Sequence, residues 1–539
     1  MHSKRTSLHL LPRKPVSPLS ASTANRLFGL LLVFLFVLAV LTFLSMKAWG
    51  EAPTPAAPTV SVAPTVGPPT SKVLVSGRGF DPYAAVDIYF DLTDLALVVT
   101  DGKGTFGVAS GLGGSGIPIV VPKNAVPGTH WITAVERYGI KAAQQPFLVR
   151  TDWAQFHFSP DHKGLNPYEN ILNPDTVANL TPLWMFTPGD SSPAVFNGVV
   201  YIVSDAAYAL NASTGALLWT YPVSGYGPTV SNGMVYIGAG DHYVYALNAA
   251  TGALVWKYAT DGTAAGTPTV ANGVVYVGTA HGLEYSYMYA LNARTGAFIW
   301  KSQGYDWCAS SPAVAGGAVY VSVQEKTYGH VDAWDAATGA FLWRALSPDS
   351  IASSPAVANG LVYVGTVSGN SAVWALNAKT GEPVWSYHFA GCCFYSSPAV
   401  ANGIVYIGFS DHNLYALDAE TGKLLWTYAT GGRVDSSPAV ADGVVYVGSD
   451  DHYLYAVNAS TGMLLWKYAT GGAVRPSPAI ANGMVYIGSG DDKLYAFGLP
   501  SEQMADKFSP PPPRPDPMML SPDWSLQPYV VVTSTINNH

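Results

Sequence analysis

One phrase recurs through most of the chain and restricts the folds that are open to it. Its clearest copy is SSPAVADGVVYVGSDDHYLYAVNASTGMLLWKYATGG, at residues 436–472. Each copy contains four alternating apolar runs, which is the pattern of β-strands. A Ser-Pro dipeptide or its equivalent marks eight copies, spaced 35 to 44 residues apart, with prolines at Pro193, Pro228, Pro268, Pro312, Pro355, Pro398, Pro438 and Pro478.

A tight turn separates the first two runs of every copy. Asn, Asp and Gly accept positive φ and therefore suit short hairpins. Four hairpin-linked strands in each of eight copies predict an all-β fold, an eight-bladed β-propeller over residues 151–498. The turn dipeptides are Asn197-Gly198, Asn232-Gly233, Asn272-Gly273, Gly316-Gly317, Asn359-Gly360, Asn402-Gly403, Asp442-Gly443 and Asn482-Gly483.

The repeat also predicts how the ring closes. The complete phrase N/D-A-x-T-G-x-x-x-W occurs seven times, against eight Ser-Pro units. The eighth copy reaches KLYAFG at 493–498 and then passes into a proline-rich tail. We therefore expect its outer strand to come from LTPLWMF around Trp184, ahead of the first copy, and to lie beside the strand around Leu494–Phe497. This exchange removes two exposed sheet edges.

The first 50 residues indicate a membrane protein. Basic residues in the segment 1–26 precede an uncharged run over 27–46, Leu27–Met46, which is long enough to cross a bilayer as a helix. The upstream positive charge predicts a single-pass cell-membrane protein with the bulk of the chain extracytoplasmic. We prefer an uncleaved anchor, and cleavage near AWG at 48–50 is the alternative. The formal net charge of -8 argues against nucleic acid as a partner.

Three further segments complete the domain organisation. Residues 47–70 are rich in Pro, Ala and Thr and predict a stiff stalk. Residues 71–150 hold short alternating runs that predict a small N-terminal β-sandwich, and VPGTHWITAVE is similar to bacterial immunoglobulin-like spacer domains. Residues 499–539, with SPPPPRPDP, predict a disordered tail.

The phrase TGxxxW resembles the tryptophan-docking motif of the pyrroloquinoline quinone (PQQ) propeller family. NILNPDTVANLTPLWMF is similar to the stretch leading into the first blade of quinoprotein alcohol dehydrogenases, so the resemblance covers residues 152–498. It implies a fold and not a reaction, because the family holds both PQQ-dependent dehydrogenases and a non-enzymatic lipoprotein of outer-membrane assembly. It also implies that these side chains pack between blades: Trp184, Trp219, Trp256, Trp300, Trp343, Trp385, Trp426 and Trp466.

Strand parity sorts the loops onto two faces. The Asn-Gly and NASTG turns lie on one face. The loops that enter each Ser-Pro unit and the SDDH turns lie on the other, which we call the Ser-Pro face. Departures from the repeat gather there, so this face is the candidate ligand-binding surface, against the simpler interpretation that loops vary. The candidates are Asp306, Trp307, Cys308, Cys392, Cys393, Phe394, Tyr395, Arg433, Asp435 and Arg475.

Three histidines occupy equivalent turns of the repeat. His242, His412 and His452 each follow an Asp, in copies two, six and seven. Such a ring of residues suggests metal ligands, but tight hairpins select polar residues and repetition spreads them one per blade. We therefore predict no metal site.

The cysteines are the least repetitive feature. We expect at least one disulfide among Cys308, Cys392 and Cys393, because the predicted compartment is oxidising. Two geometries stay open: a strained ring within the adjacent pair, or a bridge from Cys308 across the channel mouth. The resemblance implies a further alternative, a pair that faces a cofactor as in quinoprotein dehydrogenases, although those enzymes carry theirs near the start of the ring. Free thiols are the last alternative.

The preferred function is non-catalytic: a binding or scaffold protein that holds an unknown protein or cell-envelope ligand through the Ser-Pro face, with no cofactor. The alternative is a PQQ- and calcium-dependent dehydrogenase acting on an alcohol or sugar. The resemblance would then make Asp306 or Asp435 the base, with Arg433 or Arg475 on the quinone oxygens and Trp307 or the cysteine pair on the ring. No grouping matches the family's calcium ligands on motif. A structural spacer is the third interpretation.

Overall fold

The computed structural model describes residues 57–108, 116–264, 266–281, 285–305, 307–308, 310–324, 328–367, 371–389 and 395–500. Over these ranges the fold is all-β, with one short 3-10 helix, η1 (Val177–Asn179). Within them no helix is long and apolar enough to span a bilayer. The predicted anchor at Leu27–Met46 and nearly all of the predicted tail lie outside the described ranges.

Two sheets form the N-terminal domain, in the strand orders β1-β3-β6 and β2-β8-β7-β4-β5. Their buried faces share one core that includes Val75, Ile88 and Phe147. The strands are β1 (Thr59–Ala63), β2 (Val66–Gly67), β3 (Lys72–Arg78), β4 (Ala85–Phe90), β5 (Thr93–Val99), β6 (Ile117–Val120), β7 (Gly128–Glu136) and β8 (Ala142–Val149).

The stalk predicted over 47–70 is wrong in its second half. Thr59 of β1 pairs with Arg78 of β3, and Val66 of β2 pairs with Leu148 of β8. The alternating Val60 and Val62 are buried in the domain core, and the surrounding Pro and Thr residues concealed that alternation. The domain therefore begins at Thr59.

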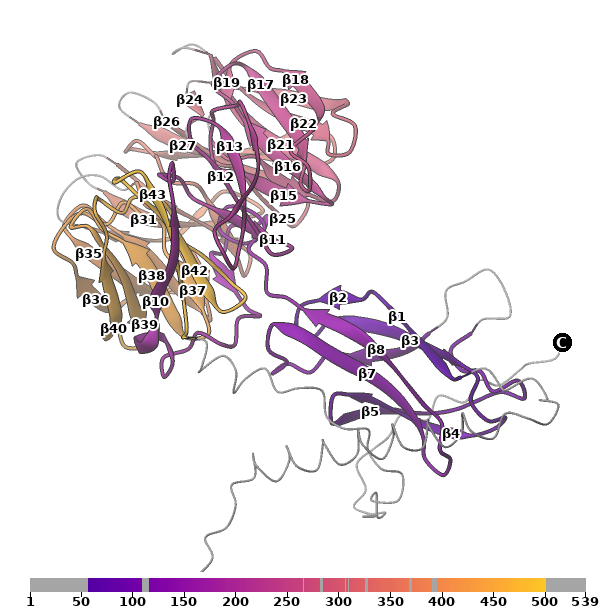
Figure 1. Cartoon of the computed structure of the whole chain (residues 1–539). Coiled ribbons are helices and arrows are strands. Elements are labelled where there is room, and N and C mark those ends of the chain that lie inside the picture. Colours follow the sequence, from indigo (N-terminus) through magenta and orange to yellow (C-terminus); the bar gives the residue numbers. More distant parts are fainter. Residues whose placement is uncertain are drawn as a thin grey trace, which may run out of the picture.

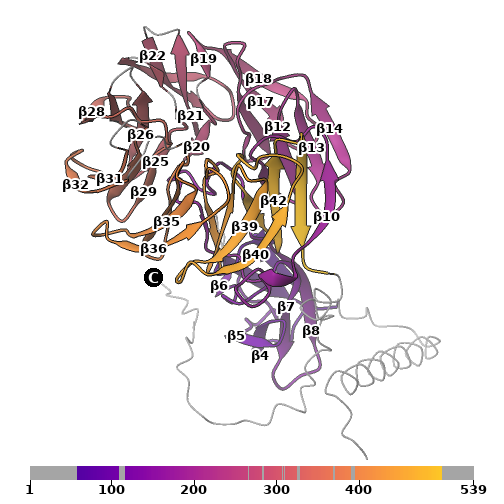
Figure 2. The same cartoon turned by 90° about the vertical axis from the view of Figure 1, so that its left-hand side faces the viewer.

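The repeats form a β-propeller. The described residues from 194 to 498, together with β10, make eight four-stranded antiparallel sheets arranged around a centre (Figures 1 and 2). We call these sheets blades 1 to 8, in the order of their Ser-Pro prolines. Short strands extend three of them: β9 (Leu165–Asn166) joins blade 7, β19 (Thr263–Ala264) joins blade 3, and β24 (Trp307–Cys308) joins blade 4.

The strand bounds follow the repeat. Blades 1 to 4 are β11 (Ala194–Phe196), β12 (Val199–Val203), β13 (Ala207–Asn211), β14 (Leu217–Tyr221); β15 (Thr229–Ser231), β16 (Met234–Gly238), β17 (Tyr243–Asn248), β18 (Leu254–Ala259); β20 (Thr269–Ala271), β21 (Val274–His281), β22 (Tyr285–Asn292), β23 (Phe298–Tyr305); and β25 (Ala313–Ala315), β26 (Ala318–Gln324), β27 (Gly329–Asp335), β28 (Phe341–Ser347). Blades 5 to 8 are β29 (Ala356–Ala358), β30 (Leu361–Gly365), β31 (Ala372–Asn377), β32 (Pro383–His388); β33 (Ala399–Ala401), β34 (Ile404–Gly408), β35 (Asn413–Asp418), β36 (Leu424–Ala429); β37 (Ala439–Ala441), β38 (Val444–Gly448), β39 (Tyr453–Asn458), β40 (Leu464–Ala469); and β41 (Ala479–Ala481), β42 (Met484–Ser489), β43 (Lys493–Gly498), β10 (Thr181–Phe186).

The turns take the backbone that their residues predict. Asn197 and Gly198 have φ of 54° and 74°, and the equivalent pair in every other blade is also positive. Gly, Asn and Asp adopt this region at low cost, so the turn dipeptides fix the register of the first hairpin in each blade.

The two ends of the repeat region close the ring. β10 pairs antiparallel with β43, placing Trp184 opposite Ala496 and Phe186 opposite Leu494. The predicted pairing of the Trp184 strand with the Leu494–Phe497 strand is confirmed. In Figure 1, β10 lies beside the yellow β43 although more than 300 residues separate them.

Neighbouring blades meet through a Trp and a Tyr that share one acceptor. At the junction of blades 2 and 3, Trp256 Nε1 and Tyr236 OH both donate to the Ala293 carbonyl oxygen, each at 3.0 Å. Gly296 lies against the indole face with φ of +70°, and a Cβ there would come within 2.7 Å of the ring. The same Trp–Tyr–Ala arrangement recurs at six other junctions, with the acceptors Ala212, Ala249, Ala336, Ala378, Ala419 and Ala459.

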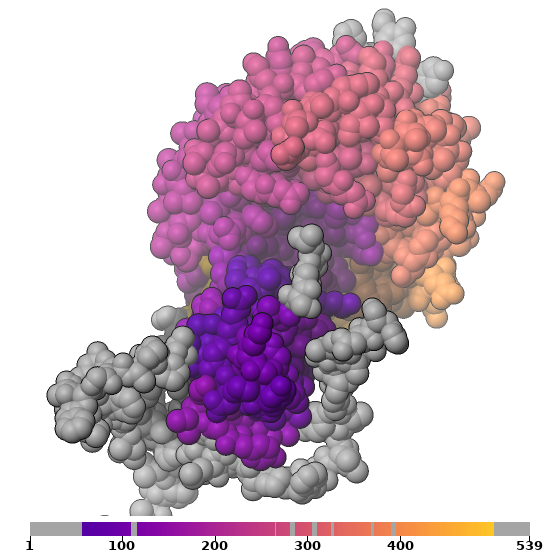
Figure 3. Space-filling model, turned by 90° about the vertical axis from the view of Figure 1, so that its right-hand side faces the viewer, coloured from indigo at the N-terminus to yellow at the C-terminus, as the bar shows by residue number. Residues whose placement is uncertain are grey.

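The junction between blades 7 and 8 is different. Trp466 Nε1 donates to the Leu180 carbonyl oxygen at 3.1 Å, because blade 8 has no TG turn of its own. The fully buried Tyr446 hydroxyl has no hydrogen-bond partner among the described residues. The core cluster at this closing junction also receives Val126 of the N-terminal domain. Asn170 Nδ2 donates to the Ala125 carbonyl oxygen at 2.8 Å and so joins the domain to the ring. Figure 3 shows the N-terminal domain, in indigo and purple, in front of the propeller.

Candidate functional site

Residues 151–166, which we call the hub segment, run around the centre of the ring and contact the innermost strand of each blade. Trp153 forms an antiparallel bridge with Val195 of blade 1, and β9 pairs in parallel with β37 of blade 7. Inner-strand N–H groups donate to the hub segment between these points, and Asn166 Nδ2 donates to Ile480 O of blade 8. The donors and acceptors are Val230 to Ala154 O, Val270 to Gln155 Oε1, Val314 to Pro160 O, Val357 to Asp161 O, Val400 to Lys163 O and Val440 to Gly164 O. One segment thus satisfies the inner edges of all eight blades.

Two histidines of the hub segment are buried and neutral. Burial lowers the pKa of His157 and of His162 to about 3, because the charged forms would lose their hydration. His157 Nδ1 donates to the His162 carbonyl oxygen at 3.2 Å, and His162 Nε2 lies 3.0 Å from Thr269 Oγ1. Phe156 stacks on His157 with the ring centroids 4.2 Å apart. Near neutral pH both histidines are therefore uncharged, and the ring of His157 packs against Phe156.

Hydroxyl groups link neighbouring blades at the Ser-Pro face. In each link a backbone N–H of one blade donates to a serine hydroxyl of the next. The links are Thr267 to Ser311, Ser311 to Ser354, Ser354 to Ser397, Ser397 to Ser437, and Ser477 to Ser192. The series is broken at two places. Between blades 7 and 8, Ser436 Oγ donates to the Pro476 carbonyl oxygen in place of a link from Ser437 to Ser477. At blade 2, Gly227 has no hydroxyl to accept a bond. A Cβ at Gly227 would lie 3.1 Å from Thr267 Oγ1, so the glycine keeps this point of the ring open.

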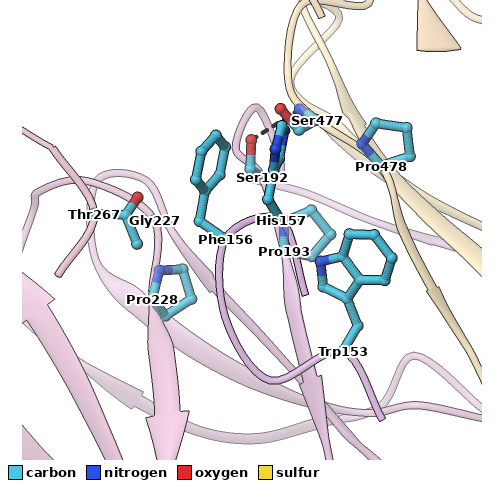
Figure 4. A pocket seen from close by; sticks show the side chains of 10 residues that line it. All are labelled: Trp153, Phe156, His157, Ser192, Pro193, Gly227, Pro228, Thr267, Ser477 and Pro478. Atoms are coloured by element: carbon cyan, nitrogen blue, oxygen red, sulfur yellow. Dashed lines mark hydrogen bonds between the residues drawn. The ribbon is translucent and has the colours of Figure 1, made fainter. Parts of the chain in front are cut away.

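A cavity of about 400 Å³ lies at Gly227. A much smaller pocket, about the size of one water molecule, adjoins it and shares Phe156, Ser192, Gly227 and Thr267 (Figure 4). The larger volume suits a small-molecule ligand or one side chain group of a larger partner. Its lining residues are Phe156, Asp190, Ser191, Ser192, Val203, Gly225, Tyr226, Gly227, Thr267, Ala473, Arg475, Pro476 and Gly490.

The cavity carries both signs of charge. Arg475 Nε and Nη2 donate to the two carboxylate oxygens of Asp450 at 2.9 and 3.2 Å. Burial raises the pKa of Asp190, and the nearby carboxylates of Asp492 and Asp491 raise it further, against the opposing effect of Arg475. The mouth of the ring therefore offers a carboxylate and a guanidinium beside the rings of the hub segment and of blade 2.

Several of the sequence-predicted residues come together at this mouth. Arg433 Nη2 lies 3.4 Å from Asp435 Oδ1, and its guanidinium carbon is 5.6 Å from the Tyr395 ring centroid. Asp450, the partner of Arg475, donates its backbone N–H to the Arg433 carbonyl oxygen at 2.8 Å. Burial raises the pKa of Asp435, although the neighbouring guanidiniums oppose the shift. Loops of blades 6, 7 and 8 thus share one charged network.

The structure does not describe the side chains of the remaining predicted residues. Asp306, Cys392, Cys393 and Phe394 lie outside the described ranges. Trp307–Cys308 forms β24 and pairs with β26, but the side chains of these two residues are also outside the description. The expected disulfide stays a prediction, with its alternatives open.

The turn histidines have a conformational explanation. His242, His412 and His452 hold φ of 69°, 73° and 73° in equivalent turns. The preceding Asp241 accepts a 2.5 Å hydrogen bond from Tyr245 OH, so the acidic residue holds the turn against its own strand. Among the described residues, no three His, Cys, Asp or Glu side chains lie close enough together to hold a metal ion.

The described mouth does not fit PQQ, the cofactor that the fold suggests. PQQ is a planar quinone that carries three carboxylates. The guanidiniums of Arg433 and Arg475 are each already paired with a carboxylate. Asp190 adds a further acidic group at the cavity wall. A trianion would therefore meet paired cations and additional negative charge, which disfavours its binding at the described mouth.

Sequence reasoning missed the part of the site that surrounds Gly227. Phe156, Asp190 and Tyr226 line the cavity and were not among the candidates. One signal was present: YGP at 226–228 is the unit with neither Ser nor Thr directly before its proline. Most hub contacts leave no comparable signal, because they run through backbone groups, although Gln155 and Asn166 contribute their side chains.

Comparisons with known proteins place the fold and leave the activity open. The family model described as outer membrane protein assembly factor BamB matches residues 175–282, 222–306, 284–437 and 417–499, which together exceed half of the chain. No curated protein matches the sequence.

Three solved structures illustrate the breadth of the fold. A europium-containing methanol dehydrogenase is 16% identical with a TM-score of 0.56, over 65% of this chain and 98% of that one. The quinohemoprotein alcohol dehydrogenase from Comamonas testosteroni is 16% identical with a TM-score of 0.53, over 64% and 80%. The computationally designed Ika8 protein is 16% identical with a TM-score of 0.52, over 59% and 98%. Enzymes and a designed protein share this architecture, so function must be argued from the site.

Proposed function

This chain belongs to the PQQ-repeat β-propeller family described as outer membrane protein assembly factor BamB, and from that premise we propose that it is a non-catalytic binding protein. It is anchored in the cell membrane by Leu27–Met46, and its propeller lies outside the cytoplasm. It holds a protein or cell-envelope ligand on the Ser-Pro face. The family description, which names an assembly factor, supports a binding role over a chemical one.

The cavity at Gly227 is the observation that carries this proposal. It combines the half-buried ring of Phe156, the 48% exposed Tyr226, the carboxylate of Asp190 and the guanidinium of Arg475. Aromatic rings beside a few fixed polar groups are typical of recognition sites. The hub segment and the serine links hold the walls in place, so a ligand would meet a preorganised surface.

The described chemistry favours binding over catalysis. His157 and His162 are buried and neutral, and the Arg433 and Arg475 guanidiniums are engaged in ion pairs. Burial raises the pKa of Asp190 and of Asp435, and guanidiniums and further carboxylates act on both groups. This arrangement presents a mixed-charge surface rather than an acid–base pair.

The finer architecture belongs to the same proposal. We interpret the eight sheets as a closed eight-bladed ring and the two N-terminal sheets as an immunoglobulin-like sandwich. The shared two-sheet core and the exchange of β10 support this interpretation. The sandwich then acts as the spacer between the bilayer and the ring.

Site-specific photo-crosslinking in intact cells tests the binding role. A photoreactive phenylalanine analogue replaces Tyr226 in the full chain, and the matched control carries it at Ala250. Ala250 is exposed on the same blade but lies in the turn on the opposite face. We expect discrete adducts from position 226 and none from position 250. Adding Gly227→Ser, which narrows the cavity, should weaken the adducts from position 226.

Two outcomes would contradict the proposal. Equal adducts from positions 226 and 250 would show that the Ser-Pro face is not the binding surface. Dye reduction by the purified full chain after incubation with PQQ and Ca²⁺, with an alcohol or sugar as substrate, would show an enzyme instead.

A further inference from the structure

The hairpin that joins β7 and β8 has an unusual distribution of side chains. Tyr138 and Ile140 at its tip are 90% and 93% exposed, and the adjacent Tyr83 is 76% exposed. A hairpin tip that faces water normally presents polar residues and hides apolar ones. We call these three residues the distal tip, because the hairpin lies at the end of the domain that points away from the propeller (Figure 1).

The charged residues of the hairpin turn back into the domain. Arg137 binds both carboxylate oxygens of Asp87, at 2.6 and 3.0 Å. Lys141 Nζ donates to Asp81 Oδ1 at 2.7 Å. The buried Glu136 accepts from the backbone N–H of Asp81 at 2.6 Å. The ionic groups are therefore satisfied within the domain, and the distal tip projects beyond them on a fixed base.

The chain enters the domain at this same end. Thr59, the first residue of β1, pairs with Arg78, the last residue of β3. The connection from Arg78 to β4 carries Asp81 and Tyr83, and it is bound to the β7–β8 hairpin through Glu136. The opposite end of the domain contacts the ring through Ala125. The domain thus has one end for the propeller and another for the preceding chain.

The preceding chain is short. Residues 47–58 separate the predicted membrane helix from Thr59, and at most about 3.5 Å per residue limits this tether to about 40 Å. With the anchor of the proposed function in place, the tether keeps the distal end of the domain within about 40 Å of the bilayer. Exposed Tyr and aliphatic residues are typical of segments that lie in the membrane interface.

We propose that the distal tip, Tyr83, Tyr138 and Ile140, inserts into the headgroup region of the lipid bilayer and holds the N-terminal domain upright on the membrane. The partner is a lipid surface. Because the nearby cations are paired with Asp81 and Asp87, insertion depends on apolar burial and not on anionic lipid, so added salt has little effect.

Lipid photo-crosslinking of the full chain in its membrane tests this proposal. A photoreactive phenylalanine analogue is placed at Tyr138 or Ile140. The matched control carries it at Leu92, which is 71% exposed in the β4–β5 turn of the same domain, near the level of His130. We expect lipid adducts from positions 138 and 140 at about ten times the yield from position 92. Equal yields, or a cross-linked pair of chains in place of lipid adducts, would overturn the proposal.

A second variant separates the tip from the anchor. With the probe at Tyr83, Tyr138→Ser combined with Ile140→Ser should lower the lipid adduct yield by about tenfold, whereas Leu92→Ser should leave it unchanged. Carbonate extraction reports the anchor independently. If the chain resists extraction but forms no lipid adducts, insertion of the distal tip is wrong and the membrane anchor stands. If the chain is extracted yet forms lipid adducts at position 138, the distal tip does contact lipid, and the proposed membrane anchor is wrong.

Discussion

Two kinds of blade junction hold this ring together. At the junction of blades 2 and 3, Trp256 and Tyr236 share the carbonyl oxygen of Ala293. At the closing junction between blades 7 and 8, Trp466 alone binds the carbonyl oxygen of Leu180, and Tyr446 OH has no partner among the described residues. At the ordinary junction two side chains donate to one carbonyl oxygen, so either can be lost without leaving that oxygen unpaired. At the closing junction a single side chain, Trp466, donates to the carbonyl oxygen of Leu180, which lies outside the repeat.

The difference follows from how the ring closes, with a strand from the start of the repeat region completing blade 8. Leu180 precedes β10, which completes blade 8, so the segment that replaces the missing strand also replaces the missing acceptor. The same segment carries Ile171 and Leu172 into a core cluster that joins blades 7, 8 and 1. Closure therefore loses one hydrogen bond but gains a large apolar core, the stronger term in this setting.

Replacing the tryptophan should have the largest effect. Trp256→Ala removes a packed indole and is expected to lower the free energy of unfolding by about 3–5 kcal/mol. The Ala293 carbonyl keeps its bond from Tyr236. Trp466→Ala should cost about 1 kcal/mol more, because the Leu180 carbonyl then loses its side-chain donor. Urea unfolding of both variants measures this difference, with Leu218→Ala on an exposed outer strand as the control. Equal losses would show that the second donor to the Ala293 carbonyl is irrelevant.

A buried carboxylate secures the closing segment. Glu169 Oε1 accepts from the backbone N–H of Ile171 at 3.0 Å, and Oε2 accepts from Thr151 Oγ1 and from the N–H of Gly483, each at 3.1 Å. In Glu169→Gln one of these positions becomes an NH₂ that faces donors. We expect a loss of about 2–3 kcal/mol in the free energy of unfolding.

The matched control for this change is Glu420→Gln. Glu420 lies in an exposed turn of blade 6, so the same chemical change there should be neutral. Thermal unfolding followed by near-UV circular dichroism compares the two variants. If both are neutral, Glu169 does not hold the closing segment.

The sequence predicted the repeating parts of this molecule better than the parts that occur once. Strand number per copy, the turn dipeptides and the pairing of β10 with β43 follow from a pattern that is written eight times. The hub segment binds through backbone carbonyls of residues such as Ala154 and Pro160, and backbone contacts leave no side-chain pattern. The early start of the N-terminal domain was hidden for a related reason, since two valines among Pro and Thr are a weak strand signal.

The candidate site divides in the same way. Arg433, Asp435 and Arg475 were found because they depart from the repeat by gaining charge, and they lie in one network. Gly227 departs by losing a hydroxyl, and its importance depends on a ring of serine links that a linear sequence does not display. The cavity at Gly227 can therefore be recognised only when the positions of the neighbouring blades are known.

The closing core also connects to the N-terminal domain, and this link should depend on pH. His130 Nδ1 lies 2.6 Å from Asp91 Oδ2, and Nε2 lies 2.7 Å from the Val126 carbonyl oxygen. Two acceptors require two N–H donors, so the charged imidazolium fits the site. Burial lowers the pKa of His130, but the hydrogen bonds to Asp91 and Val126 outweigh it and raise the pKa above its usual 6.5.

A raised folded-state pKa stabilises the domain at low pH. The contribution is complete below about pH 6.5 and is lost as pH rises through the folded-state pKa. After allowance for solvent screening, it amounts to about 0.5–1 kcal/mol. The stability of the full chain should therefore fall slightly between pH 6 and 9, and His130→Gln should remove this slope. His388→Gln, at a strand end of blade 5, is the control. An unchanged slope in His130→Gln would contradict this assignment.

Removing one tyrosine hydroxyl at each kind of junction discriminates best between them, because we expect effects of different sign. Tyr236→Phe removes a hydroxyl that donates to the Ala293 carbonyl, and it should cost about 1 kcal/mol. Tyr446→Phe removes a buried hydroxyl without a partner, so it relieves a desolvation penalty and should be neutral or stabilising by up to about 1 kcal/mol. Burial raises the pKa of Tyr446, with the carboxylates of Glu169 and Asp442 adding to the shift, so the group is a neutral phenol throughout the experiment.

Both substitutions delete one oxygen from a fully buried tyrosine at the same position of the repeat, so packing changes cancel in the comparison. Parallel urea unfolding at pH 7 gives the two differences. A loss of the same size in both variants would mean that Tyr446 has found a donor or acceptor, and the closing junction would then be as fully satisfied as the junctions within the repeat. Opposite signs would establish that ring closure leaves one defect and that the apolar core around Ile171 and Leu172 tolerates it.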